Sequence, residues 1–134
     1  MTNSSIKSSL IVIAVVILAA ILLYTRTFGK LKVTEGNLEI KDIDQSYSQM
    51  ITIDKNAKYP HSVDITFIGH VNDSAIIGYG YTDSTFYWSD TVNGSIEISY
   101  KGDFYSDSAF INYKSLGGMH GKISINYKIY STNK

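Results

Sequence analysis

Residues 123–130 read ISINYKIY, and this run decides the fold class of the chain. Apolar side chains at Ile123, Ile125, Tyr127 and Ile129 alternate with more polar ones. Successive side chains of a β-strand point to opposite faces, so this alternation predicts a strand with one buried face. Residues 96–101 and 63–67 repeat the pattern, and no stretch after residue 30 has helical spacing. We therefore expect an all-β domain.

Weaker runs of the same kind lie along the rest of the domain. They centre on Val33, Ile40, Ile51, Ile77, Tyr87 and Ile111. Turn-forming residues, Asp54-Lys55-Asn56 among them, separate the runs at roughly ten-residue intervals. Asn93-Gly94 is the strongest of these signals, because both residues accept positive φ, and it predicts a hairpin between the runs around Tyr87 and Ile98. Together these runs predict a small antiparallel β-sandwich of about 8–9 short strands, with a small barrel as the alternative.

The N-terminal segment has a different character. Residues 8–25 read SSLIVIAVVILAAILLYT and carry no charge. As a helix, eighteen residues span about 27 Å, close to the roughly 30 Å of a bilayer's hydrocarbon core. The sequence therefore predicts one transmembrane helix over about residues 8–25, within a membrane anchor of residues 1–29. The β domain then occupies residues 30–134.

A cleaved signal peptide is the alternative for this segment, with the best cut after Gly29. That site is poor, and the apolar run is longer than the roughly 7–15 residues usual in signal peptides. Tyr24, Arg26 and Lys30 also resemble the aromatic and basic residues that border a membrane-spanning helix. We therefore favour a retained, single-pass anchor.

The orientation of the anchor is contested by two signals. Arg26, Lys30 and Lys32 on the domain side outnumber Lys7, and a positive-inside count would place the domain in the cytoplasm. The domain itself is rich in Ser, Thr, Asn and Tyr and sparse in lysine, as is common in exported β modules. We expect an extracytoplasmic domain.

Composition excludes several classes of protein. The chain has no cysteine, which removes disulfides, thiolate metal sites and lipoprotein attachment. From Lys30 onward, 10 basic side chains stand against 12 acidic ones, and the lysines are scattered. Nucleic-acid binding requires clustered cations and is therefore not expected. The expected partners are the lipid bilayer and an envelope protein, a glycan or a peptide.

No motif for catalysis or metal binding is present. His61, His70 and His120 lack the spacing that places two ligands on one face, so no metal and no cofactor are expected. No serine lies in a known nucleophile motif. The sequence thus predicts a membrane-anchored, non-catalytic binding or structural module of the cell envelope. A carbohydrate- or peptide-binding module is the first alternative and a small envelope hydrolase the second.

One stretch is a candidate ligand site: residues 76–90, IIGYGYTDSTFYWSD. On a strand, Gly78 and Gly80 share one face, where two missing side chains would leave a shallow groove beside aromatic rings and carboxylates. The predicted ligand-binding residues are Tyr79, Tyr81, Asp83, Tyr87, Trp88 and Asp90. The alternative is that the aromatic residues belong to the core and the glycines make room for a neighbouring ring.

The anchor prediction can be tested directly. If the segment is retained, the full-length protein stays in the membrane pellet after a carbonate wash, and its mass includes Met1 or Thr2. Recovery of a soluble form that begins near Lys30 would show instead that the segment is a cleaved signal peptide.

Overall fold

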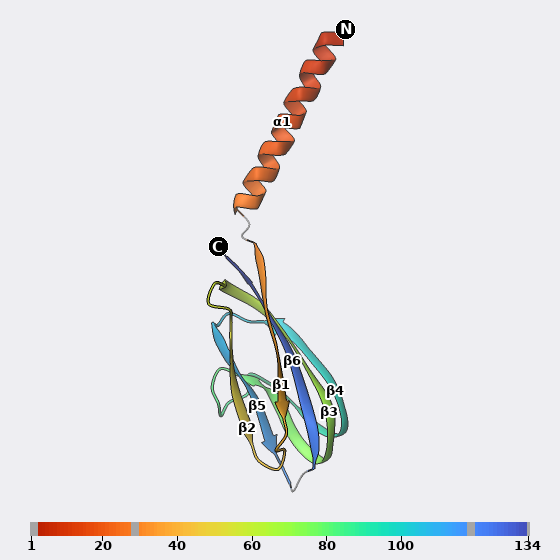
Figure 1. The fold of residues 1–134 in the computed structure, drawn as a ribbon, viewed down its shortest axis with the longest axis vertical. Helices are drawn as coiled ribbons and strands as arrows, with labels where there is room; N and C mark the ends of the chain where they lie inside the picture. Colours follow the sequence, from red (N-terminus) through yellow and green to blue (C-terminus); the bar gives the residue numbers. More distant parts are fainter. Residues whose placement is uncertain (1–2, 28–29, 118–119, 134) are drawn as a thin grey trace. The chain divides into compact units, whose positions relative to one another are not determined.

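The computed structural model describes residues 3–27, 30–117 and 120–133. The chain divides into two compact units, an N-terminal unit that ends at Lys30 and a second unit over Leu31–Asn133 (Figure 1). Each unit is described by itself.

The N-terminal unit contains one helix, α1, over Asn3–Thr27. Within it, the 18 residues of Ser9–Arg26 have a mean hydropathy of 2.4. By length and composition this helix is sufficient to cross a membrane, and a signal sequence would meet the same description. The prediction of one apolar N-terminal helix is confirmed, while its insertion and retention remain predictions.

The second unit is built from strands. Their bounds are β1 Leu31–Ile40, β2 Tyr47–Thr52, β3 Lys58–Gly80, β4 Trp88–Asp103, β5 Ser108–Ser115 and β6 Gly121–Thr132. All neighbours pair antiparallel in one sheet of order β1-β6-β3-β5-β2, and β4 pairs with the other edge of β3. The all-β prediction is confirmed for this unit.

The long strand β3 changes its neighbour midway along its length. Residues 58–71 pair with β6, whereas residues 75–80 pair with β5. β4 accompanies β3 through both parts (Figure 1). The sheet therefore has two halves, β1-β6-β3-β4 and β2-β5-β3-β4, that share the β3–β4 ribbon.

The ribbon bends where the two halves join. Val71 pairs with Gly94 and Ala75 with Val92, so three residues of β3 stand opposite Asn93 alone. Extra residues in one strand of a pair bend the strand and increase its twist. The bulge is also held from outside: the Asn72 N–H donates to the His120 carbonyl at 3.2 Å, and the Leu116 N–H donates to the Ser74 carbonyl at 3.2 Å.

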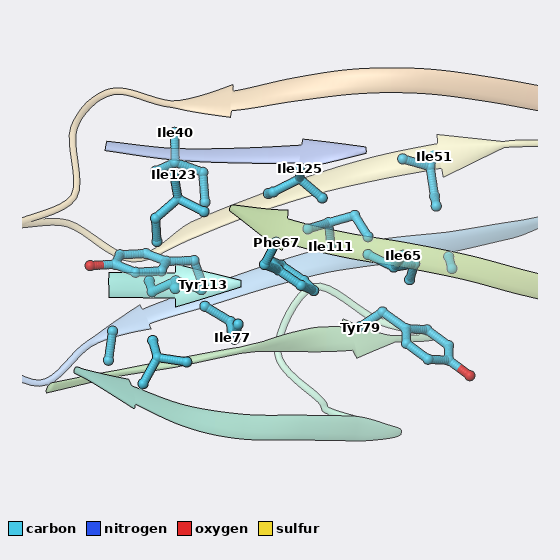
Figure 2. Packing of buried hydrophobic residues seen from close by; sticks show 14 of the residues in the cluster. Ile40, Ile51, Ile65, Phe67, Ile77, Tyr79, Ile111, Tyr113, Ile123 and Ile125 are labelled. Atoms are coloured by element: carbon cyan, nitrogen blue, oxygen red, sulfur yellow. The ribbon is translucent and has the colours of Figure 1, made fainter. Parts of the chain in front are cut away.

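The bend brings the two halves together around one core. From the first half come Ile65, Phe67 and Ile125; from the second come Ile77 and Ile111, and all five are buried. Figure 2 shows these side chains converging between the strands. The remaining large fully buried side chains are Ile40, Val63, Tyr79, Phe104, Tyr113, Ile123 and Ile129.

The strand count and the two-sheet sandwich predicted from the sequence are not confirmed. Over residues 30–117 and 120–133 the structure has six strands, because three pairs of predicted runs merge: those around Val33 and Ile40 in β1, around Ile65 and Ile77 in β3, and around Tyr87 and Ile98 in β4. In place of two separate sheets, one hydrogen-bonded sheet curls around the core.

The merging has a physical reason at each turn signal. Gly36 lies within β1, opposite Tyr127, and the Tyr127 ring occupies the space that a side chain would need. Asn93-Gly94 makes no hairpin. Gly94 has φ +72° within β4, where it serves the bend of the ribbon. Glycine and asparagine thus bend or accommodate a continuing strand here and do not reverse it.

Gly94 offers a test of the bend. A Cβ at Gly94 would meet nothing within 4 Å, so substitution costs backbone strain alone. We expect Gly94→Ala to lower the free energy of unfolding by about 1–2 kcal/mol, and Gly94→Asn to lower it less, because asparagine tolerates positive φ. Urea denaturation of the full-length protein in mild detergent measures both. Equal stability of the alanine variant and the natural protein would contradict the role given to Gly94.

Candidate functional site

The aromatic residues of the predicted site lie in a packed cluster. Tyr79 is fully buried, its ring centroid is 5.1 Å from that of Tyr100, and its hydroxyl donates to the Tyr100 hydroxyl at 3.3 Å. Trp88 is half-buried. Its ring centroid lies 4.9 Å from that of Tyr100 and 6.2 Å from that of Phe67. Tyr79 and Trp88 therefore help to close the core between the two halves of the sheet.

The groove predicted over Gly78 and Gly80 is absent, because the chain fills it. A Cβ on Gly78 would overlap the Trp88 carbonyl and lie 2.8 Å from the Phe86 ring. A Cβ on Gly80 would overlap the Thr85 carbonyl. The glycines thus make room for the backbone around Thr85 and Trp88, and the alternative given by the sequence, room for a neighbouring ring, applies to Phe86 beside Gly78.

Asn112 holds this loop against the strands. Its side-chain N–H₂ donates to the carbonyls of Thr82 and Thr85, at 3.0 and 2.8 Å. The Ser48 hydroxyl donates to the Asn112 carbonyl oxygen at 2.6 Å. Because Asn112 is almost fully buried, these three bonds satisfy a polar group that would otherwise be costly to bury.

The other predicted site residues are exposed but only partly brought together. The rings of Tyr81 and Tyr87 lie 5.5 Å apart and are 42% and 59% exposed. Asp83 lines a different small hollow of about 230 Å³, beside Ser48 and Asn112. The Asp90 carboxylate accepts from the Thr91 N–H at 2.8 Å. Ligand binding by these residues remains a prediction.

A larger hollow lies elsewhere, between the β2–β3 turn and the β4–β5 loop. We call it the turn groove; its volume is about 1110 Å³. Its lining is Met50, Thr52, Ile53, Asp54, Lys55, Ala57, Lys58, Tyr59, Pro60, His61, Tyr105, Asp107, Ser108 and Thr132. The Ile53 N–H donates to the Asp107 carbonyl at 3.0 Å and so ties its two walls together.

Two tyrosines stand at the surface of the turn groove, Tyr59 at 63% exposure and Tyr105 at 74%. Tyr59 has φ +49°, which is unfavourable for a bulky side chain. The register of β3 against β6 is irregular on both sides of Pro60. Irregularities of this kind re-aim side chains and cluster at functional sites.

The turn groove was missed by sequence reasoning. Asp54-Lys55-Asn56 is recognisable as a turn, and the structure confirms it: the Ala57 N–H donates to the Asp54 carbonyl, and the Asn56 N–H donates to the Asp54 carboxylate, each at 2.7 Å. Nothing in the sequence shows that the loop carrying Tyr105 packs beside this turn. The only local signal is the single proline, which interrupts a strand.

His61, which lines the turn groove, lies beside a serine hydroxyl. The Ser62 hydroxyl and His61 Nδ1 lie 3.1 Å apart, but no carboxylate bonds His61 among the residues that the structure describes. A hydrolytic triad needs that third group to orient the imidazole. Across the same described ranges, no group of three His, Cys, Asp or Glu side chains could hold a metal.

Burial of tyrosines predicts a pH dependence. Burial raises the pKa of Tyr47, Tyr79, Tyr81 and Tyr113, and the hydrogen bond to Tyr100 raises that of Tyr79 further. The folded state therefore holds protons that the unfolded state loses above pH about 10, so stability is complete below that pH and falls as the pH rises.

Tyrosinate absorbance together with circular dichroism checks this expectation. Ionisation of all 11 tyrosines should be complete only when the fold is lost. Tyr79→Phe should reduce the late, unfolding-linked part of the signal. Full ionisation of an intact fold would contradict the burial described.

Comparisons with known proteins identify no family. No family model matches the chain, and no curated protein matches it. Among solved structures, a chain of Bacillus endospore appendages, described as disulfide-linked pili, has a TM-score of 0.42 at 8% identity, over 79% of this chain and 93% of its own. A chain from work on CBM4 structure and function has a TM-score of 0.38 at 12% identity, over 74% and 75%. These likenesses are weak and do not identify a function.

Proposed function

We propose that this protein is a single-pass membrane protein whose extracytoplasmic β domain is a non-catalytic binding module of the cell envelope. The observation that carries the proposal is the turn groove, a hollow of about 1110 Å³ with two exposed tyrosines at its surface. Exposed aromatic side chains beside a hollow are typical of binding surfaces.

The membrane part of the proposal is supported by the N-terminal helix. Eighteen residues of mean hydropathy 2.4 are long enough to span a hydrocarbon core. Tyr24 and Arg26 at the end of the run match the residues that border membrane-spanning helices. The retained anchor then keeps the binding module at the membrane.

The chemistry of the turn groove suits an extended ligand of mixed polarity, a glycan or a peptide. The faces of Tyr59 and Tyr105 offer apolar area to a sugar ring or a side chain. The carboxylates of Asp54 and Asp107 accept hydrogen bonds from hydroxyl or amide groups, and Lys55 donates to their acceptors. The pair Tyr81 and Tyr87, predicted from the sequence to bind a ligand, is the second candidate binding surface.

The strain at Tyr59 supports the turn groove over this second surface. A tyrosine held at positive φ costs stability of about 1–2 kcal/mol, which glycine would avoid. Since the ring is 63% exposed, packing recovers little of this cost. A position where the chain gives up stability to present a ring outward is typical of functional sites.

The test uses the full-length protein in mild detergent on an array of defined oligosaccharides and an array of extended peptides. Tyr59→Gly relieves the strain while it removes the ring, so we expect higher stability and about tenfold weaker binding, the equivalent of 1.4 kcal/mol. Tyr105→Ala should weaken binding to a similar extent.

Tyr87→Ala is the matched control, because it removes an exposed tyrosine at the second surface. Binding that Tyr87→Ala abolishes and Tyr59→Gly spares would move the site to the second surface. The absence of any ligand on both arrays would count against a binding function for the groove.

A further inference from the structure

The long strand β4 has an edge that no strand covers. β4 pairs with β3 alone among the strands that the structure describes. From Gly94 to Asp103 this pairing runs without a register shift, and the segment contains no proline. Proteins usually blunt such an edge with bulges or proline, because its free N–H and C=O groups accept another strand.

The other two outer strands are not equally open. β1 is bridged to the start of the β2–β3 turn, where the Asp54 N–H donates to the Thr34 hydroxyl at 2.9 Å. β2 is only six residues long. The segment of β4 over residues 94–103 matches β1 in regular length, and in the described part of the domain it is thus the longest regular outer edge that is not bridged to another segment of the chain.

The exposed side chains of this segment have a symmetric arrangement of charge. Glu97, Ser99 and Lys101 point to the exposed face, while Ile98 and Tyr100 are half-buried. Glu97 forms no ion pair with any residue that the structure describes. The Lys101 ammonium forms an ion pair with the Asp64 carboxylate, with Nζ and Oδ2 3.2 Å apart, while the Lys101 side chain remains 74% exposed. Opposite charges therefore lie two positions to either side of Ser99.

We propose that two copies of this chain associate through β4, antiparallel, with the twofold axis at Ser99. Glu97 of each copy then stands opposite Lys101 of the other, and Ile98 stands opposite Tyr100. A twofold interface repeats each contact, so the arrangement provides two cross-strand ion pairs. The sheets of the two copies become continuous across the interface.

The other registers are electrostatically worse. With the axis at Tyr100, Glu97 stands opposite Asp103 twice, and like charges repel. With the axis at Ile98, Glu97 and Lys101 both face serines. A shift by one residue places exposed side chains opposite core-facing ones. Parallel pairing in register places Glu97 against Glu97. An axis at Gly102 also opposes Lys101 and Asp103, but it pairs only residues 101–103 of β4 with each other. Among the registers that pair most of the segment, charge complementarity therefore selects the one centred on Ser99.

The absence of cysteine makes the register directly testable. Directly opposed residues of antiparallel strands have Cα atoms about 4.5–5.5 Å apart, within the range that a disulfide spans. Mild oxidation of full-length Ser99→Cys in detergent should give a covalent dimer. Ser46→Cys, an exposed serine outside β4, is the matched control and should stay largely monomeric.

Mixed variants test the same register at its ends. Ser95→Cys and Asp103→Cys should each crosslink poorly alone and efficiently when the two are mixed, because residue 95 faces residue 103. No disulfide from Ser99→Cys above the Ser46→Cys control would overturn the proposal. Crosslinking of Tyr100→Cys in preference to Ser99→Cys would overturn the register.

Charge exchange provides a second, reversible measurement by analytical ultracentrifugation. Glu97→Lys and Lys101→Glu each create like-charge pairs and should weaken self-association at least about tenfold. Mixing the two variants should restore association, as should the double exchange in one chain. Thermal melting separates a folding defect from an interface defect. Equal association of the natural chain, the two single variants and the double exchange would refute the proposal. Tyr59→Gly should leave the association unchanged.

Discussion

The bend of the β3–β4 ribbon is the constraint on which the rest of the domain depends. Three residues, Asn72, Asp73 and Ser74, stand opposite Asn93 alone, and Gly94 supplies the positive φ beside it. A straight ribbon would leave one flat sheet with an exposed apolar face. The bend folds that face onto itself, so that Phe67 and Ile77, on either side of it, belong to one buried core.

The bend is fixed by hydrogen bonds from the β5–β6 connection. The Asn72 side chain accepts from the His120 N–H at 2.6 Å, in addition to the backbone bonds to His120 and Leu116. Exposed backbone groups of the bulge thereby gain partners within the chain. The β5–β6 connection, near the end of the sequence, thus stabilises the bend of β3, near the middle of the sequence.

The same architecture separates the surfaces that could act. The β3–β4 loop closes over Gly78 and Gly80 and removes the groove that a straight strand would have had. The β2–β3 turn and the β4–β5 loop leave the turn groove between them, and the regular half of β4 keeps a free edge. In our proposals the groove takes a ligand and the edge takes a second copy, with no shared residue.

The sequence by itself determined the apolar helix, the all-β character of the remainder and the buried face of the three clearest runs, at Val63–Phe67, Ile96 and Ile123–Ile129, because side-chain periodicity reports local geometry and burial directly. It also placed the turn at Asp54-Lys55-Asn56, and it gave the packing of the glycines against a neighbouring ring as an alternative to a groove. Only the tertiary structure decided that Asn93-Gly94 bends a strand without reversing it, that Tyr79 is core, and that Tyr59 and Tyr105 border one hollow. Each of these features depends on which strand or loop lies opposite. Such pairing joins residues far apart in the chain, and the local sequence pattern does not specify it.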